Sequence, residues 1–248
     1  MHEVADQAVE KAGSSSPLIL ALDIGGTGLK AGLVDGKGRL RGPHLRVDTP
    51  AKPPPQELVA ALVALAKPLS GYDRVAAGFP GVIRRGVILT SPTLGHPKLN
   101  GFNLEKALVQ AFRKPARVMN DAEMQGLAAL RRRRGLEMVI TLGTGFGSAL
   151  FWNGQPTPHL ELSTHDFRHG QTYNQQLGNE ALRRAGRKKW NRRLAKAIQA
   201  LRALVHFDHL YIGGGNTANV RLKLPPDVSL VSNVNGLRGG AWAWRKSV

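Results

Sequence analysis

Residues 18–30 read LILALDIGGTGLK, an apolar run that ends in an aspartate and a glycine-rich loop. Residues 138–147, MVITLGTGFG, repeat the pattern in the second half of the chain. Each loop is followed by another apolar run, residues 31–34 or 148–152, and then by a turn signal, Asp35-Gly36 or Asn153-Gly154. The sequence therefore predicts the same unit twice, a strand, a glycine loop, a second strand and a tight turn.

These loops can turn several backbone N–H groups toward one point, which makes a cradle for an anion that side chains would obstruct. A single GGTG is more often an ordinary glycine-rich turn. A repeat separated by about half the chain instead favours two related lobes whose loops hold a phosphate chain from both sides.

Composition sets limits on the function. The chain has 248 residues, a formal net charge of +18 and no cysteine. A disulfide framework and a thiolate zinc site are therefore excluded. The positive charge favours a polyanionic partner, although arginine spread over a solvated surface explains it equally well.

The first 17 residues contain Glu3, Asp6 and Glu10 and no apolar core, so we expect a disordered extension rather than a signal peptide. No apolar run reaches the length of a membrane span. We therefore expect a cytoplasmic protein that does not associate with a membrane.

The remaining pattern alternates strands and helices, which indicates an α/β fold with mixed sheets. Expected strands lie at 39–47, 74–78, 116–119, 209–212 and 228–231, and expected helices at 57–66, 104–112, 120–134 and 237–244. A further helix carries an apolar stripe of Trp190, Leu194, Ala197, Ile198, Leu201, Leu204 and Val205.

Five motifs occur in the order seen in the ROK family of sugar kinases, namely DIGGT at 23–27, GFPG at 78–81, NDA at 120–122, GTGFG at 143–147 and IGGG at 212–215. From about Leu18 to the C-terminus, the chain resembles the short, zinc-free branch that contains polyphosphate glucokinases. This resemblance implies the two-lobed actin-like ATPase (ribonuclease H-like) fold with a cleft between the lobes. We expect lobes at 18–119 and 120–235, with the C-terminal helix, 236–248, joining the first.

The resemblance also implies a mechanism. Asp121 follows a strand and opens a helix, where its carboxylate can accept the proton of an attacking hydroxyl. Asn120 would hold a neighbouring sugar hydroxyl, although Asn-Asp before a helix is by itself more often a plain N-cap. Asp23 resembles the carboxylate that holds Mg²⁺, directly or through water, and capping its own turn is the alternative.

The expected donor, polyphosphate or ATP, would bind at the glycine loops. The candidate donor-binding residues are Asp23, Gly25, Gly26, Thr27, Lys30, Gly143, Thr144, Gly145, Gly213, Gly214 and Gly215. The candidate sugar-binding residues are Gly81, Thr93, Asn120, Glu161, Thr164 and His165.

Three positions depart from the family pattern. Thr93 stands where relatives usually carry Asn, Leu99 where they carry Trp, and Thr164 where they carry the histidine after the sugar-binding glutamate. Removing hydrogen-bond partners from a sugar pocket lowers its affinity for the sugar. The sequence therefore supports phosphoryl transfer more strongly than it supports glucose as the substrate.

Two clusters allow alternative interpretations. His159, Glu161, His165, Asp166 and His169 share one loop, where a polar, substrate-facing surface accounts for them better than a metal site. Residues 131–134 and the lysines and arginines of 188–193 form either solvated helix faces or a track that guides a long polyanion to the cleft.

The function that we expect is a hexokinase-type phosphotransferase acting on the terminal hydroxyl of a glucose-like or mannose-like hexose. The alternative is a sugar or phosphate sensor that kept the fold after its pocket changed. The family also contains repressors, but the segment before the first strand is too short for a helix-turn-helix module, so nucleic acid is not an expected partner. We expect a homodimer that uses Mg²⁺ and no zinc.

Overall fold

The computed structural model describes residues 17–131 and 134–245, and the expected N-terminal extension lies almost wholly outside this part of the chain. Its first sheet has the strand order β3-β2-β1-β4-β7, with the bounds Leu45–Val47, Leu29–Val34, Ile19–Ile24, Arg74–Phe79 and Ala116–Asn120. Strand β1 pairs antiparallel with β2 and parallel with β4, which pairs parallel with β7.

The second sheet repeats this arrangement. Its order is β10-β9-β8-β13-β14, with the bounds Gln155–Pro156, Phe146–Trp152, Leu136–Leu142, His209–Gly213 and Val228–Leu230. Strand β8 pairs antiparallel with β9 and parallel with β13, as β1 does with β2 and β4. The repeated glycine hairpin and the mixed sheets expected from the sequence are therefore confirmed.

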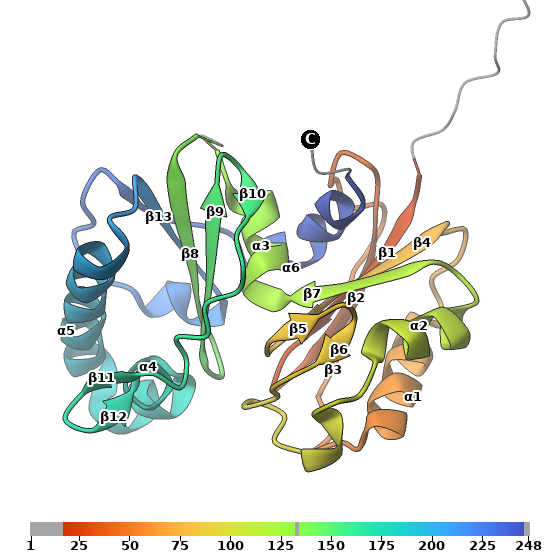
Figure 1. The fold of residues 1–248 in the computed structure, drawn as a ribbon, viewed down its shortest axis with the longest axis horizontal. Helices are drawn as coiled ribbons and strands as arrows, with labels where there is room; N and C mark the ends of the chain where they lie inside the picture. Colours follow the sequence, from red (N-terminus) through yellow and green to blue (C-terminus); the bar gives the residue numbers. More distant parts are fainter. Residues whose placement is uncertain (1–16, 132–133, 246–248) are drawn as a thin grey trace, which may run out of the picture.

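Helices cover both sheets and fill the space between them (Figure 1). Helices α1, Pro55–Ala66, and α2, Leu104–Phe112, share one apolar core with the first sheet. Helices α4, Tyr173–Leu177, and α5, Asn179–Val205, share another with the second sheet. Between the sheets lie α3, α6 and η3, which span Asp121–Ala129, Asn235–Arg238 and Gly239–Trp244.

Short elements complete the chain. A small hairpin is formed by β5, Ile83–Arg84, and β6, Val87–Ile88, and another by β11, Asp166–Arg168, and β12, Gln171–Thr172. Two 3-10 turns, η1 at Pro97–Leu99 and η2 at Gly215–Asn219, follow β6 and β13.

Several expected elements are shorter than the sequence pattern indicates. The strand expected at 39–47 is only β3, because Gly42 has a φ of +89° and Pro43 has no N–H for the ladder. Helix α3 ends at Ala129 rather than at 134.

Two more expectations need correction. The expected terminal helix divides into α6 and η3 at Gly239, where the backbone approaches Met124 so closely that a Cβ would lie 1.6 Å from its carbonyl oxygen. In α5, Leu204 is exposed, so it does not belong to the apolar stripe. Gly186, with a φ of +72°, divides α5 into two helical stretches, and the stripe lies on the second.

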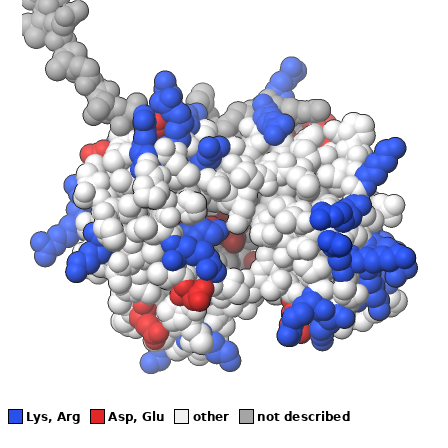
Figure 2. Space-filling view, turned by 180° about the vertical axis from the view of Figure 1, so that it is seen from behind, with Lys and Arg blue, Asp and Glu red and all other residues white. Residues whose placement is uncertain are grey.

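Lysine and arginine side chains are spread over the surface and gather beside α5 on the outer side of the second sheet, while a hollow between the lobes contains acidic atoms (Figure 2). Part of the basic run at 131–134 falls outside the described residues, so the expected polyanion track stays a prediction. No helix in the described part of the chain is long and apolar enough to cross a bilayer.

Candidate active site

The topology of the first sheet brings Asp23, Asn120 and Asp121 together. Because β1, β4 and β7 run parallel, their carboxyl ends meet at one edge of the sheet. Asp23 pairs with Gly78 at the end of β1, and Phe79 pairs with Asn120 at the end of β7. Asp121 follows as the first residue of α3. These side chains line a cleft with a volume of about 320 Å³.

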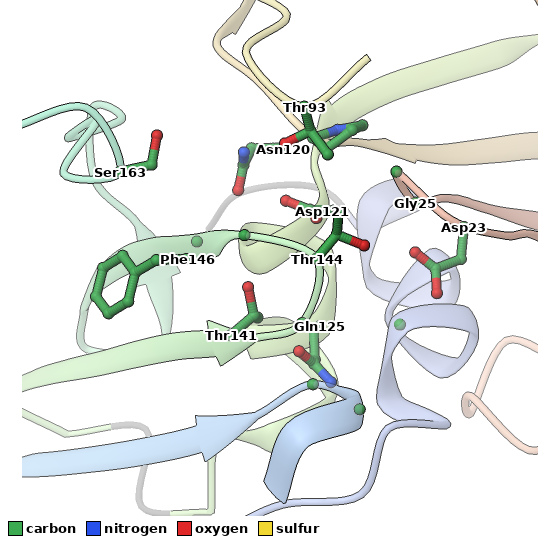
Figure 3. Close-up of a pocket in the computed structure, with 18 of the residues that line it drawn as sticks. Asp23, Gly25, Thr93, Asn120, Asp121, Gln125, Thr141, Thr144, Phe146 and Ser163 are labelled. Atoms are coloured by element: carbon green, nitrogen blue, oxygen red, sulfur yellow. The ribbon is translucent and has the colours of Figure 1, made fainter. Parts of the chain in front are cut away.

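The two glycine loops meet across this cleft. Each closes on itself, since Gly25 N–H donates to the Gly28 carbonyl and Gly143 N–H to the Gly145 carbonyl, both at 3.0 Å. The Thr144 hydroxyl donates to the Thr27 hydroxyl at 3.2 Å, which joins the loops at their tips. In the view of Figure 3, Thr144 and Asp121 are drawn near the centre, and Gly25 and Asp23 lie to their right.

Free backbone donors remain at these tips. Among the described residues, none accepts a hydrogen bond from the amides of Gly26, Thr27 or Thr144. A Cβ added at Gly143 would meet no atom within 4 Å, so the loop borders open space. Unpaired amides around an open volume form the kind of concave surface that binds anions.

Most of the residues predicted from the sequence line this cleft. From the candidate donor set these are Asp23, Gly25, Gly26, Thr27, Lys30, Gly143, Thr144, Gly145, Gly214 and Gly215, and from the candidate sugar set Gly81, Thr93, Asn120 and Glu161, together with Asp121. The structure does not bring the other three there. Gly213 is buried against the side chain of Gln125. Thr164 borders a neighbouring hollow, and His165 is exposed and lines neither the cleft nor this hollow.

Asp121 lies partly buried at the bottom of the cleft. Its Oδ1 accepts a hydrogen bond from Ala122 N–H at 2.8 Å. Burial raises the pKa of its carboxyl, the negative charge of Asp23 raises it further, and the pKa reaches about 7 despite the opposing Ala122 bond. A carboxylate with this pKa can exchange a proton at neutral pH.

Asn120 holds the helix that carries Asp121. Its Oδ1 accepts from the N–H groups of Ala122 and Glu123, at 2.9 and 3.2 Å, and Glu123 accepts from Asn120 N–H in return. Its Nδ2 donates to the Gly81 carbonyl at 3.1 Å. The N-cap alternative is therefore realised, and the same side chain also lines the cleft.

His159 and Glu161 also line the cleft, and together with Glu123 they form a polar cluster. His159 Nδ1 lies 3.1 Å from Glu123 Oε1, and its Nε2 lies 3.7 Å from Glu161 Oε2. Burial lowers the pKa of His159, but the two carboxylates outweigh it and raise the pKa to about 9. Burial raises the pKa of Glu161, but the nearby imidazole of His159 and the hydrogen bond from Ser163 outweigh burial, so the net shift is downward.

Asp23 is the candidate ligand for Mg²⁺. Its Oδ2 lies 2.9 Å from Lys30 Nζ, and the side chain faces the cleft beside the first glycine loop (Figure 3). Mg²⁺ commonly takes one or two protein carboxylates and completes its shell with water and substrate phosphates. One carboxylate next to an open, amide-lined volume fits this requirement.

Sequence reasoning missed several residues that line the cleft, namely Arg46, Gln125, Asn233 and Gly236. Gln125 was detectable, because it lies one helical turn after Asp121 and so on the same face of α3. No sequence motif includes the other three residues, Arg46, Asn233 and Gly236. Only the tertiary fold brings them to the site.

The acidic and histidine side chains of the loop at 156–170 do not all face the same way. Of the five acidic and histidine residues in it, His159 and Glu161 face the cleft, whereas His165, Asp166 and His169 are exposed. Among the described residues, no three His, Asp or Glu side chains come together in a way that could hold a metal ion.

Known proteins resemble this chain in sequence and in fold. The model of the ROK family matches residues 19–159. The chain is 26% identical over 246 residues to a polyphosphate glucokinase of Mycobacterium leprae, which covers 90% of this chain and 73% of the relative. Among solved structures, it resembles the inorganic polyphosphate/ATP-glucomannokinase from Arthrobacter sp. strain KM, with a TM-score of 0.82 and 28% identity over 91% of this chain and 97% of the other.

A second solved structure supports the fold. The ROK family glucokinase from Streptomyces griseus, in complex with glucose and AMPPNP, aligns with a TM-score of 0.74 at 18% identity, over 90% of this chain and 98% of the other. The two-lobed actin-like ATPase fold expected from the sequence is confirmed.

Proposed function

This chain belongs to the ROK family, and on that premise we propose that it is a sugar kinase that transfers a phosphoryl group from polyphosphate or ATP to the terminal hydroxyl of a hexose. The observation that carries the proposal is the position of Asp121. Asp121 lines the same cleft as two glycine loops that meet at their tips, and the pKa of its carboxyl is raised to about 7.

The donor phosphates lie along the glycine loops in this proposal. Phosphoryl transfer needs mainly positioning and neutralisation of charge. The amides of Gly26 and Thr144 and the hydroxyl of Thr27 supply hydrogen-bond donors, and Lys30 supplies positive charge. Bound Mg²⁺, held by Asp23 directly or through water, would neutralise further charge on the phosphates.

The acceptor hydroxyl lies against Asp121, which takes its proton as the oxygen attacks the phosphoryl group. The second Nδ2–H of Asn120 and the carboxylate of Glu161 bind other hydroxyls of the sugar. The side chain of Leu99 is buried in the core of the first lobe and takes no part. A glucose-like or mannose-like hexose is the substrate class that this polar pocket suits.

The test crosses donors with acceptors. Purified protein with Mg²⁺ is incubated with polyphosphate or ATP and with glucose, mannose, fructose or N-acetylmannosamine, and the sugar phosphate is measured. We expect turnover with at least one pair and none when Asp121 is replaced by Ala. A folded protein that phosphorylates no hexose with either donor contradicts the proposal.

The sensor alternative rests on Thr164, which borders a neighbouring hollow and leaves the cleft without a side chain at the position of the usual family histidine. Calorimetry in the same experiment decides between the two functions, because a sensor binds hexose or polyphosphate without turnover. The homodimer expected from the family resemblance stays a prediction that the molar mass in solution will test.

A further inference from the structure

One ring nitrogen of His159 makes no hydrogen bond within the described part of the chain. Its side chain is 8% exposed, and Nδ1 pairs with Glu123 on α3. Nε2 is buried and has no hydrogen-bond partner, although it belongs to a residue that lines the cleft. A buried polar atom without a partner is costly, and such atoms in a native fold require an explanation.

Two polar groups near Nε2 also lack hydrogen bonds, namely one carboxylate oxygen of Glu161 and the hydroxyl of Ser163. Glu161 Oε1 accepts from Ser163 N–H at 3.0 Å, while Glu161 Oε2 lies 3.7 Å from His159 Nε2, beyond hydrogen-bond reach. The Ser163 hydroxyl is also buried without a partner, and Ser163 lines the cleft (Figure 3). One imidazole nitrogen, one carboxylate oxygen and one hydroxyl on the same wall therefore make no hydrogen bond to the described residues.

A sugar hydroxyl has the complementary chemistry. It accepts one hydrogen bond through its oxygen and donates another through its hydrogen. Placed between His159 and Glu161, it would accept from Nε2–H and donate to Oε2. A phosphate or a carboxylate suits this wall less well, because its negative charge would face the carboxylate of Glu161.

We propose that His159 is a sugar-binding residue of this chain, and that its Nε2 and the Oε2 of Glu161 together bind one hydroxyl of the acceptor other than the one that is phosphorylated. The inference rests on the proposed function and names a further residue for that site. Relatives carry the histidine of this pocket at the position of Thr164. In this chain, His159 would supply the imidazole instead.

The charges around His159 hold its ring in the donor form. Glu123 faces it from α3, Glu161 from its own loop, and Asp121 acts on it through space. Burial lowers the pKa of His159, but Glu123 and Glu161 outweigh burial and raise the pKa to about 9, so both ring nitrogens carry a proton at neutral pH. Above that pH, the remaining ring proton stays on one nitrogen, and the wall loses a donor or its link to α3.

The first test measures glucose and mannose binding without donor, by calorimetry from pH 6 to 10. For wild type we expect affinity to fall as pH rises through about 9. His159→Ala should weaken binding about 10–100-fold at pH 7, the value for a hydrogen bond to a charged group. His159→Gln keeps a donor, so it should bind better than the alanine variant and show no fall near pH 9. The matched control is His44→Gln, an exposed histidine, which should behave as wild type.

Glu123→Gln tests the same inference without changing the imidazole. It removes the carboxylate that pairs with Nδ1, so the fall in affinity should move to lower pH. A histidine that only supports packing predicts no such movement. Circular dichroism of each variant confirms that it is folded.

Deoxy sugars identify the hydroxyl. Wild type should discriminate against one monodeoxyglucose other than the 6-deoxy sugar, and His159→Ala should bind that sugar and glucose with nearly equal affinity. Wild-type affinity and pH dependence in a folded His159→Ala, while wild type still phosphorylates a hexose, overturn this inference alone. A wild-type protein that neither binds nor phosphorylates any hexose overturns the proposed function and this inference together.

Discussion

The hydroxyl of Thr144 donates a hydrogen bond to the hydroxyl of Thr27 at 3.2 Å, although 117 positions separate the two residues in the chain. Each threonine occupies the tip of one glycine loop, and each loop joins the first two strands of one sheet. The bond therefore links the two copies of the internal repeat at the mouth of the cleft. An anion entering there meets donors from both lobes at once.

Removing the two hydroxyls should show whether they act on the same ligand. We expect Thr27→Ala and Thr144→Ala each to raise the KM for the donor about 3–10-fold, the range for one neutral hydrogen bond. The double variant should lose less than the product of the single losses, because both residues contact one phosphate chain and each other. Strictly multiplicative losses in steady-state kinetics would argue for separate roles.

Two glycines in these loops should respond differently to the same methyl group. A Cβ on Gly143 meets nothing within 4 Å, whereas a Cβ on Gly26 would lie 2.2 Å from Thr93 Cγ2 and 3.1 Å from Thr144 Cγ2. We expect Gly143→Ala to keep the wild-type Tm and raise the donor KM, because its methyl group occupies the space of the anion. Gly26→Ala should change both. An unaltered donor KM in Gly143→Ala means that the anion does not pass this loop.

Asp121→Asn should separate binding from proton transfer. Asparagine keeps the shape and can still accept the Ala122 N–H, but it cannot take a proton from the acceptor. We expect kcat to fall about 10²–10⁴-fold with little change in the donor dissociation constant. The measurement is steady-state turnover together with calorimetric donor binding. A variant with near wild-type kcat would remove Asp121 from the role of base.

The strands and loops were predictable because local rules govern them. The apolar run before Asp23 and the turn at Asp35-Gly36 define a hairpin without help from the rest of the chain. The equivalent pattern at Met138 and Asn153 defines its copy. Asp121 was predictable because a helix start after a strand directs a short side chain to the sheet edge, where the parallel strands of α/β folds end.

The missed residues depend on tertiary contacts instead. Arg46 reaches the cleft because β3 pairs with β2 and lays the guanidinium beside Gly28, where a Cβ would lie 2.8 Å from it. Gly236 reaches Asp23 only because α6 packs between the sheets. The pairing of His159 with Glu123 joins a loop to a helix 36 positions away, and no local pattern encodes it.

The pH dependence of turnover should follow Asp121 on the acid side. Its ionised carboxylate is the form that accepts a proton, and its pKa is raised to about 7 by burial and by Asp23. We therefore expect kcat/KM for the hexose to fall tenfold per pH unit below about 7. Because the donor phosphates also titrate in this region, the residual activity of Asp121→Asn serves as the reference. If the residual activity of Asp121→Asn falls at low pH as that of wild type does, the fall is caused by titration of the donor and not by Asp121.

The same carboxyl should make the ligand-free protein less stable as pH rises. Its pKa is about 7 in the folded chain and near 3.8 when unfolded, so the folded state binds this proton more tightly. Linkage then lowers the free energy of unfolding between pH 4 and 7 as the proton is released. Asp121→Asn has no charge to bury, so at pH 8 its Tm should exceed that of wild type by at least several °C. The gain should shrink at pH 5, where Asp121 is protonated in the folded protein. Equal Tm values at both pH values would show that the cleft solvates this carboxylate as well as water does.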